Sequence, residues 1–245
     1  EINNFNIFYL AYILLALIVI ILWIFIPYVS LIIFLMIASY HFGKEDTQFL
    51  IIENSYYNQF LFLLKGFLII FAPMYFHFDE TMSIFRLLLI ENENFYNLLD
   101  LIESKRILLY CIILSTLANF LLFIKKFELK KFTIFFDYFS ILIINYYFSP
   151  LVAFTIYFCF LHSIRHSITL MSELDENNLS NGFKIFIKKS LPLTIITAIF
   201  CLIGLYFLNN TYNFDSSILK IIFIGLASLT FPHILLEYLI EKNEK

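Results

Sequence analysis

Five histidines are the residues of this chain best suited to chemistry: His41, His77, His162, His166 and His233. They lie in or beside long apolar runs, where an ionisable group is costly to bury and is therefore a functional candidate. Taken singly, each is equally well explained as a histidine that packs against neighbouring helices or bridges them. His162 and His166 indicate more as a pair, because residues four apart stack on one face of a helix. Two imidazoles in that arrangement suit the coordination of one metal ion.

The depth of the histidines along their helices favours the same chemistry. At a rise of about 1.5 Å per residue, His162 lies about 16 Å and His166 about 22 Å from the outer end of their helix. On the same rise, His41 lies about 20 Å and His233 about 22 Å from the outer ends of theirs. We therefore expect these four histidines to converge and to bind a metal, whereas His77 ends its helix at the opposite depth. Four imidazoles without thiolates are typical of non-haem iron, zinc or copper.

Three carboxylates near these histidines are candidate outer partners of the imidazoles. Glu45 lies four residues after His41 and is followed by Asp46, and Glu237 lies four residues after His233. A carboxylate that accepts the spare imidazole N–H selects one tautomer of the ring. For Glu45 a solvated position after the helix end is the simpler interpretation. Glu237 is equally consistent with a charge at the membrane surface.

Other residues around the predicted centre have more ordinary explanations. Arg165 is expected to extend toward the acidic segment that begins at Glu173. Tyr40, Tyr157 and the many phenylalanines are expected to pack against their neighbours. An interior so rich in aromatic side chains would nevertheless suit a long apolar ligand.

The composition predicts the elements that position these residues. Of the 245 residues, 61% are hydrophobic and 14% are charged, and the mean hydropathy is +0.86. A soluble domain is about half apolar and about a quarter charged. We therefore expect an all-α polytopic helical membrane protein, with residues 1–245 forming a single integral membrane domain. The net charge of −3 gives no reason to expect a nucleic-acid partner, and the three cysteines, all within apolar runs, indicate no disulfide framework.

Polar residues divide the chain into eight apolar runs of about helical length. These runs are Ile7 to Ile26, Tyr28 to Phe42, Tyr57 to Phe78, Ile107 to Ile124, Phe132 to Phe148, Leu151 to Met171, Ser190 to Leu208 and Ile218 to Ile240. The segment from Glu80 to Ser104 mixes charged and apolar residues, as an amphipathic helix at the membrane surface does. We expect about seven to eight transmembrane helices and one such interfacial helix.

Lysine clusters predict the orientation, because short loops rich in Lys and Arg stay in the cytoplasm. Clusters occur at residues 125–131, 184–189 and 242–245, and alternation of the spans places all three on one side. The loops at 149–150 and 209–215 then lie on the other side and contain neither Lys nor Arg. Arg86, Lys105 and Arg106 are the exceptions. The pattern predicts a multi-pass protein of the inner (plasma) membrane with a cytoplasmic C-terminus.

At the histidine motifs the sequence resembles the Brp/Blh-type β-carotene 15,15′-dioxygenases of bacteria and archaea. The matching stretches are LWIFIPYVSLIIFLMIASYHFGKED (Leu22 to Asp46), KGFLIIFAPMYFH (Lys65 to His77), YFCFLHSIRHS (Tyr157 to Ser167) and FPHILLEYL (Phe231 to Leu239). The resemblance implies that His41, His162 and His166 bind Fe(2+) and that Asp46 is the carboxylate that ends HFGxxD. It also implies a multi-helix membrane enzyme that cleaves β-carotene or a related carotenoid with O2. The product would be retinal, often made for a rhodopsin.

The chain departs from that family pattern at one motif. Members also have a Pro-His-Gly-containing motif at the end of an earlier helix, which supplies a further ligand, and this chain has none. The place of the motif would lie before Glu1, so we expect either a missing N-terminal helix or an incomplete site. His233 is the candidate to complete the coordination, unless it is a nearby structural histidine.

Two other functions stay open on the sequence alone. An intramembrane zinc-dependent lipid amidohydrolase of the ceramidase or adiponectin-receptor kind would also use histidines and a carboxylate, with a zinc-bound water as nucleophile. A non-catalytic transporter or assembly protein would use the histidines to bridge helices or relay protons. Iron dependence and O2 consumption distinguish the dioxygenase from the amidohydrolase, and stoichiometric metal distinguishes both enzymes from the transporter.

Overall fold

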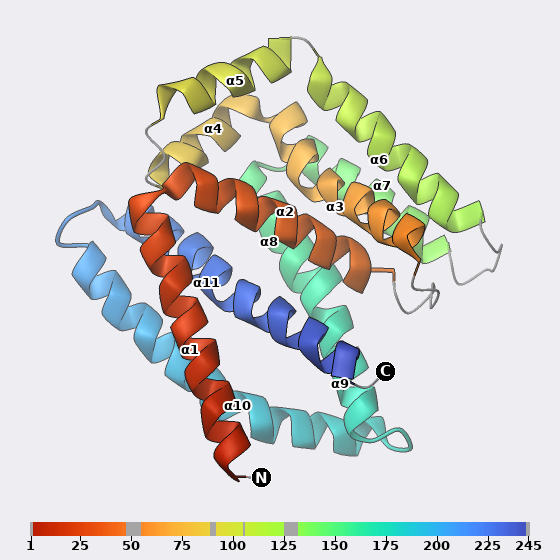
Figure 1. Ribbon diagram of the computed structural model, residues 1–245. Coiled ribbons are helices and arrows are strands. Elements are labelled where there is room, and N and C mark those ends of the chain that lie inside the picture. Colours follow the sequence, from red (N-terminus) through yellow and green to blue (C-terminus); the bar gives the residue numbers. More distant parts are fainter. Residues whose placement is uncertain (1, 48–54, 89–91, 105, 125–131, 244–245) are drawn as a thin grey trace.

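The computed structural model describes residues 2–47, 55–88, 92–104, 106–124 and 132–243, with the side chains of 2–9, 122–123 and 236–243 left aside. Every regular element in these ranges is a helix (Figure 1). The all-α fold class predicted from the composition is therefore confirmed.

The helices follow one another along the chain without long connections in the described ranges. They are α1 (Ile2–Phe25), α2 (Pro27–Glu45), α3 (Tyr56–Phe76), α4 (Phe78–Leu87), α5 (Glu93–Ser104), α6 (Ile107–Ile124), α7 (Phe132–Tyr147), α8 (Pro150–Ile156), the π-helix η2 (Tyr157–Ser163), α9 (Ile164–Leu174), α10 (Leu179–Leu208) and α11 (Phe214–Asn243). Each predicted apolar run corresponds to a helix, with α8, η2 and α9 continuous. Pro27 and Pro150 begin α2 and α8, where a missing backbone N–H costs nothing.

Not all of these helices are long enough to cross a bilayer. Among the residues whose side chains the structure describes, four helices are long and apolar enough, namely Tyr56–Phe76, Pro150–Leu174, Leu179–Leu208 and Phe214–Leu235. Three shorter apolar helices accompany them in the described part of the chain, at Leu10–Phe25, Ile107–Leu121 and Phe132–Tyr147. The expected total of seven to eight spans therefore stays a prediction.

The predicted interfacial helix from Glu80 to Ser104 is wrong in one respect, because the segment forms two helices. α4 ends at Leu87, and a new helix, α5, begins at Glu93. The side chain of Asn92 accepts a hydrogen bond from the backbone N–H of Phe95 at 3.1 Å, and asparagine is a favoured N-cap. Both helices are amphipathic and pack apolar faces on a core around Trp23.

The start of α10 also differs from the prediction at Ser190. The helix begins at Leu179, because Asn178 caps it by accepting from the backbone N–H of Asn181 at 3.2 Å. The lysine cluster at residues 184–189, expected in a loop, is therefore part of this helix. The most apolar part of α10 has no buried residue, and the helix lies at the outside of the molecule (Figure 1).

α2 and α3 approach each other backbone to backbone in the centre of the molecule. A Cβ atom built on Gly43 would lie 1.8 Å from the carbonyl oxygen of Phe62, and one on Gly66 would lie 1.7 Å from that of Ser39. Ser39 and Gly43 lie four residues apart on α2, and small residues at this spacing let two helices approach closely. The contact places the last turn of α2 against the middle of α3, next to Lys65.

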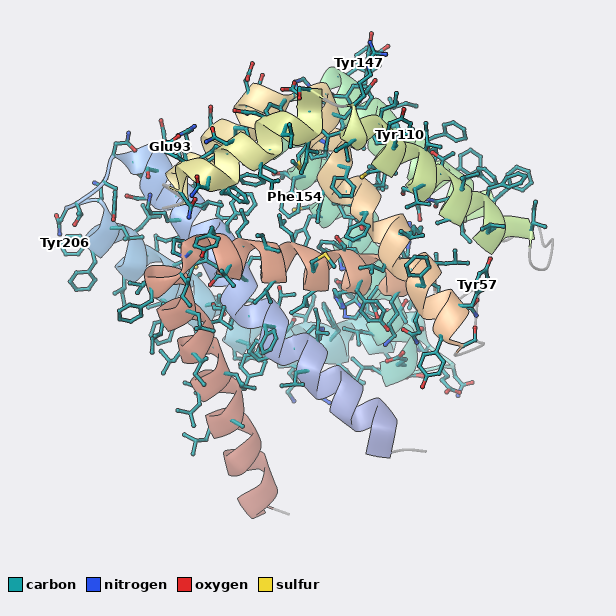
Figure 2. The ribbon with its side chains drawn as sticks, turned by 45° about the horizontal axis from the view of Figure 1, so that its top comes forward. Tyr57, Glu93, Tyr110, Tyr147, Phe154 and Tyr206 are labelled. Carbon is teal, nitrogen blue, oxygen red and sulfur yellow. The ribbon has the colours of Figure 1, made fainter. Side chains whose placement is uncertain are left out.

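The remaining helices surround this central pair. α6 and α7 pack on α3, α11 packs on α1 and also contacts α2, and α9 leads into α10. In Figure 2, Tyr110, Tyr147 and Tyr206 extend outward, whereas Phe154 lies among the helices. The C-terminal turn of α2, the helix η2–α9 and α11 thus meet in one region, and they are the elements that carry the predicted histidines.

Candidate metal centre

Four of the five histidines form a closed ring of neighbouring imidazoles. The ring centroids of His41 and His162 are 5.7 Å apart, and those of His162 and His166 are 6.4 Å apart. His233 closes the ring, at 6.3 Å from His166 and 5.8 Å from His41. The structure thus brings together the residues that the depth argument singled out, from α2, η2–α9 and α11.

The ring is closed to solvent on one side and open on the other. His41 and His162 are each 7% exposed, the side chain of His166 is 35% exposed, and His233 is exposed. A cluster of nitrogen donors without thiolates fits iron, zinc or copper by its chemistry. In the ranges that the structure describes, no group of three or more His, Cys, Asp or Glu side chains is arranged to hold a metal ion. Metal binding by the four histidines therefore stays a prediction.

His162 and His166 stack as their spacing requires. Their rings are parallel to within 1°. His162 belongs to the π-helical segment η2, and wide turns of this kind are common at functional sites. Phe42 holds the ring of His162 from the side, edge to face at 4.7 Å between centroids.

Two consecutive carboxylates at the end of α2 each face one of these stacked rings. Glu45 Oε2 lies 3.3 Å from Nδ1 of His166, and Asp46 Oδ1 lies 3.4 Å from Nδ1 of His162. An Nδ1–H directed at a carboxylate leaves Nε2 as the nitrogen available to a metal. The solvated position expected for Glu45 is wrong, because its side chain is only 9% exposed. The side chain of Glu237 falls outside the described residues.

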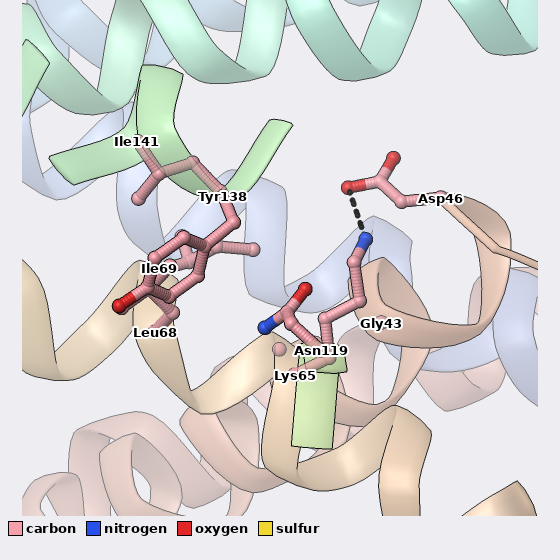
Figure 3. A pocket seen from close by; sticks show the side chains of 9 residues that line it. Gly43, Asp46, Lys65, Leu68, Ile69, Asn119, Tyr138 and Ile141 are labelled. Atoms are coloured by element: carbon pink, nitrogen blue, oxygen red, sulfur yellow. Dashed lines mark ion pairs between the residues drawn. The ribbon is translucent and has the colours of Figure 1, made fainter. Parts of the chain in front are cut away.

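Asp46 accepts hydrogen bonds from several elements at once. The Tyr157 hydroxyl donates to Oδ2 at 2.7 Å, and the Arg165 guanidinium donates to Oδ1 at 3.2 Å. Figure 3 shows the Lys65 ammonium reaching the same carboxylate, with Nζ 3.8 Å from Oδ2. Burial alone would raise the pKa of Asp46, but Lys65, His162 and Arg165 together hold that pKa at about 2. The carboxylate therefore remains ionised beside His162.

Arg165 does not extend toward Glu173, which corrects the expectation from the sequence. Its guanidinium binds Asp137 on α7 through two hydrogen bonds, of 2.9 Å and 2.7 Å. Buried carboxylates need a paired charge, and a guanidinium satisfies both oxygens of Asp137 while also reaching Asp46. Lys65, Asp46, Arg165 and Asp137 together form the buried charge cluster, in which two cations balance two anions.

Sequence reasoning missed Lys65 and Asp137. Both lie inside runs that are otherwise apolar, Lys65 in α3 and Asp137 in α7, and their side chains are 5% and 9% exposed. The signal that could have found them is the same one that found the histidines, an ionisable residue within a span.

His77 lies apart from the ring, at the junction of α3 and α4. Its Nε2 is 2.9 Å from the backbone oxygen of Asn145, and its Nδ1 is 3.8 Å from Glu80. These contacts indicate that His77 stabilises the junction between α3 and α4.

An apolar cavity of about 100 Å³ adjoins the histidine ring. Phe42 and Tyr157 form the wall nearest to His162. The cavity extends from there between α2, α3, α4, α7, α8 and α11, and its lining includes no charged residue.

The fold and the site define a class of protein: an all-helical, strongly apolar chain with a histidine cluster, its carboxylate partners and an apolar cavity inside the bundle. The chain belongs to the β-carotene 15,15′-dioxygenase family, whose model matches residues 1–241. The "Beta-carotene 15,15′-dioxygenase" of uncultured marine bacterium 66A03 is 29% identical over 230 residues, which are 93% of this chain and 78% of that protein. No solved structure matches the chain significantly. The resemblance drawn from the motifs is confirmed, and the chain is an enzyme of the β-carotene dioxygenase type.

Proposed function

We propose that this chain is a membrane-embedded, iron-dependent dioxygenase that cleaves the central 15,15′ double bond of β-carotene with O2 and forms two molecules of retinal. The observation that carries the proposal is the ring of four imidazoles, two of them backed by carboxylates, beside an uncharged cavity. The family membership supports the substrate class.

His41, His162 and His166 are the proposed Fe(2+) ligands, and His233 is the proposed fourth. Neutral imidazoles suit ferrous iron, and Glu45 and Asp46 would hold two of the rings in the ligating tautomer. Iron, when bound, supplies the site at which O2 becomes reactive toward a double bond. Binding would require the rings to draw together, because their present spacing is wider than that of a filled site.

The reaction balances without any further reagent. The carbon–carbon double bond and the O–O bond break, and each of the two carbons forms a double bond to one oxygen atom. The electrons that O2 accepts come from those two carbons, so no external reductant or proton donor is needed. The protein has to bind the polyene, exclude water and hold the correct bond near the histidines, and an apolar cavity suits these tasks.

A membrane location fits this substrate, because a carotenoid dissolves in the bilayer rather than in water. Four helices have the length and hydropathy of spans, and α10 exposes apolar side chains along its length. We propose that the chain resides in the inner (plasma) membrane with its C-terminus in the cytoplasm. Retinal released into the bilayer could then reach a rhodopsin.

The test is expression of the full chain in cells that make β-carotene. The cells should lose pigment and accumulate retinal, and an iron chelator or removal of O2 should stop both changes. Hydrolysis of a lipid amide with bound zinc would instead establish the amidohydrolase. Purified protein without stoichiometric metal and without aldehyde products would favour a transporter or assembly protein.

A further inference from the structure

The cavity beside the histidine ring is elongated along the helix axes. Its lining on α2 extends from Phe42 back to Phe34, and its lining on α8 and η2 extends from Tyr157 back to Pro150. Eight residues of α2 correspond to about 12 Å at the rise of an α-helix. One end of the cavity therefore meets His162 through Phe42 and Tyr157, and the other end lies about 12 Å away.

α4 forms the far end of the cavity. Thr81, Ile84 and Phe85 of this helix belong to the lining, and Phe85 is also part of the buried core around Trp23. The position of α4 resists displacement, because hydrogen bonds hold both of its ends. At its start, the Thr81 hydroxyl is within hydrogen-bond distance of the backbone oxygen of Pro73 in α3, at 3.2 Å, as well as of that of His77, at 2.8 Å.

The last turn of α4 is tied to two other helices. The Trp23 indole N–H donates to the backbone oxygen of Leu88 at 3.2 Å. The Lys220 ammonium donates to the backbone oxygen of Leu87, so that α11 also holds this turn. A short helix secured in this way can act as a rigid stop.

The polar groups in the cavity wall are directed away from an occupant. The Ser39 hydroxyl donates to the Leu35 carbonyl at 2.8 Å, and the Asn145 amide donates to the Ile141 carbonyl at 2.8 Å. Thr81 is bonded in the same way to His77. With these donors satisfied by backbone oxygens and no charge in the lining, the wall favours a hydrocarbon over a ligand with polar substituents.

We propose that this cavity receives one apolar end of the polyene and that α4 is the stop that decides which double bond lies at the histidines. The inference rests on the proposed function. Only a wall across the long axis of a linear substrate can limit how far that substrate enters. The other half of the polyene would pass the open side of the ring, where His166 is partly exposed and His233 is exposed.

The test compares Ile84→Ala with Ile143→Ala in the full chain. Ile84 lies in the cavity floor, whereas Ile143 is 55% exposed on α7 and does not line the cavity. Ile84→Ala deepens the cavity, so the inserted end should slide further and the cleaved bond should shift by one double bond. The expected products are two aldehydes of unequal length, and Ile143→Ala should still give retinal alone. The ratio of products is measured by chromatography, so a low yield of enzyme does not obscure the result.

Ile84→Phe provides a second, opposite change and serves if Ile84→Ala accumulates poorly. It makes the cavity shallower, and it should also give unequal aldehydes because the substrate stops short. Retinal as the sole product of both Ile84 variants would overturn the role of α4, although the proposed function would stand. A wild-type chain that forms no aldehyde at all would instead refute the proposed function.

Discussion

At the residue scale, the two carboxylates that end α2 decide what the paired histidines can do. Glu45 and Asp46 are consecutive, and they face Nδ1 of His166 and His162 respectively. Carboxylates in this position favour the tautomer with the proton on Nδ1, which is how outer carboxylates support metal-binding histidines. His233 is the most exposed of the four histidines.

The metal centre predicts the effect of removing single imidazoles. His41→Ala, His162→Ala and His166→Ala should each abolish both bound iron and retinal formation, because each removes one proposed ligand. His77→Ala is the control, since His77 lies at the α3–α4 junction, and its iron content should stay near wild type. Iron is measured by elemental analysis of the purified protein. Wild-type iron in any of the first three variants would exclude that histidine from the centre.

The buried charge cluster predicts a loss of stability. Asp137→Asn leaves the Arg165 charge without its bidentate partner, and breaking a buried pair costs about 3–5 kcal/mol. Arg165 is 28% exposed, so a smaller loss of about 2–3 kcal/mol is expected. The free energy of unfolding in detergent measures it. The exposed Glu173→Gln should change that free energy by less than about 0.5 kcal/mol, and an equal effect in both variants would contradict the pairing.

The convergence of the four histidines could be predicted from the sequence, but the pairing of the charges around them could not. The four histidines of the ring lie at a similar depth along their helices, and the rise per residue of an α-helix is enough to estimate that depth. Lys65 and Asp137 pair with Asp46 and Arg165, which belong to other parts of the fold. The spacing of residues within one helix does not show which helices will pack together, so these pairs could not be foreseen. Glu45 was misjudged because the structure continues α2 to Glu45, which brings its carboxylate under His166.

At the element scale, the close contact of α2 and α3 sets the position of the end of α2, which carries His41, Glu45 and Asp46. Gly66→Ala places a methyl group where the carbonyl of Ser39 lies, so the two helices must separate. Overpacking of this kind costs about 1–3 kcal/mol, and displacement of the end of α2 should also lower activity. Gly225→Ala is the matched control, because a Cβ there meets nothing within 4 Å. It should leave activity unchanged and should not destabilise the protein; thermal unfolding and retinal yield test both variants.

The helices themselves were largely predictable, and their ends were not. Each of the eight apolar runs located a helix, because a helix that buries or exposes apolar side chains all along its length needs continuous hydrophobicity. The break at Asn92 and the early start of α10 at Asn178 depend on single capping hydrogen bonds, which hydropathy does not record. The approach of Gly43 and Gly66 was not predicted either, since it joins residues of separate helices.

At the scale of the whole molecule, the proposed orientation can be tested with cysteines placed at its two faces. Lys184 and Asn210 are both exposed; Lys184 lies near the start of α10, and Asn210 follows its end. In intact cells a membrane-impermeant maleimide should label Asn210→Cys, but it should label Lys184→Cys only after permeabilisation. Labelling of the wild type gives the background from the natural cysteines. The reverse pattern would place the C-terminus outside the cytoplasm.

The cavity that α4 closes has a consequence for the timing of turnover. After cleavage the two retinals are chemically identical, but one lies between the histidines and α4 and the other lies toward the exposed rings. They therefore leave at different rates, and departure of the enclosed molecule should limit the cycle. Rapid mixing of enzyme with β-carotene should accordingly show a fast first turnover followed by a slower steady state. Ile84→Ala should alter the slow phase more than the fast one.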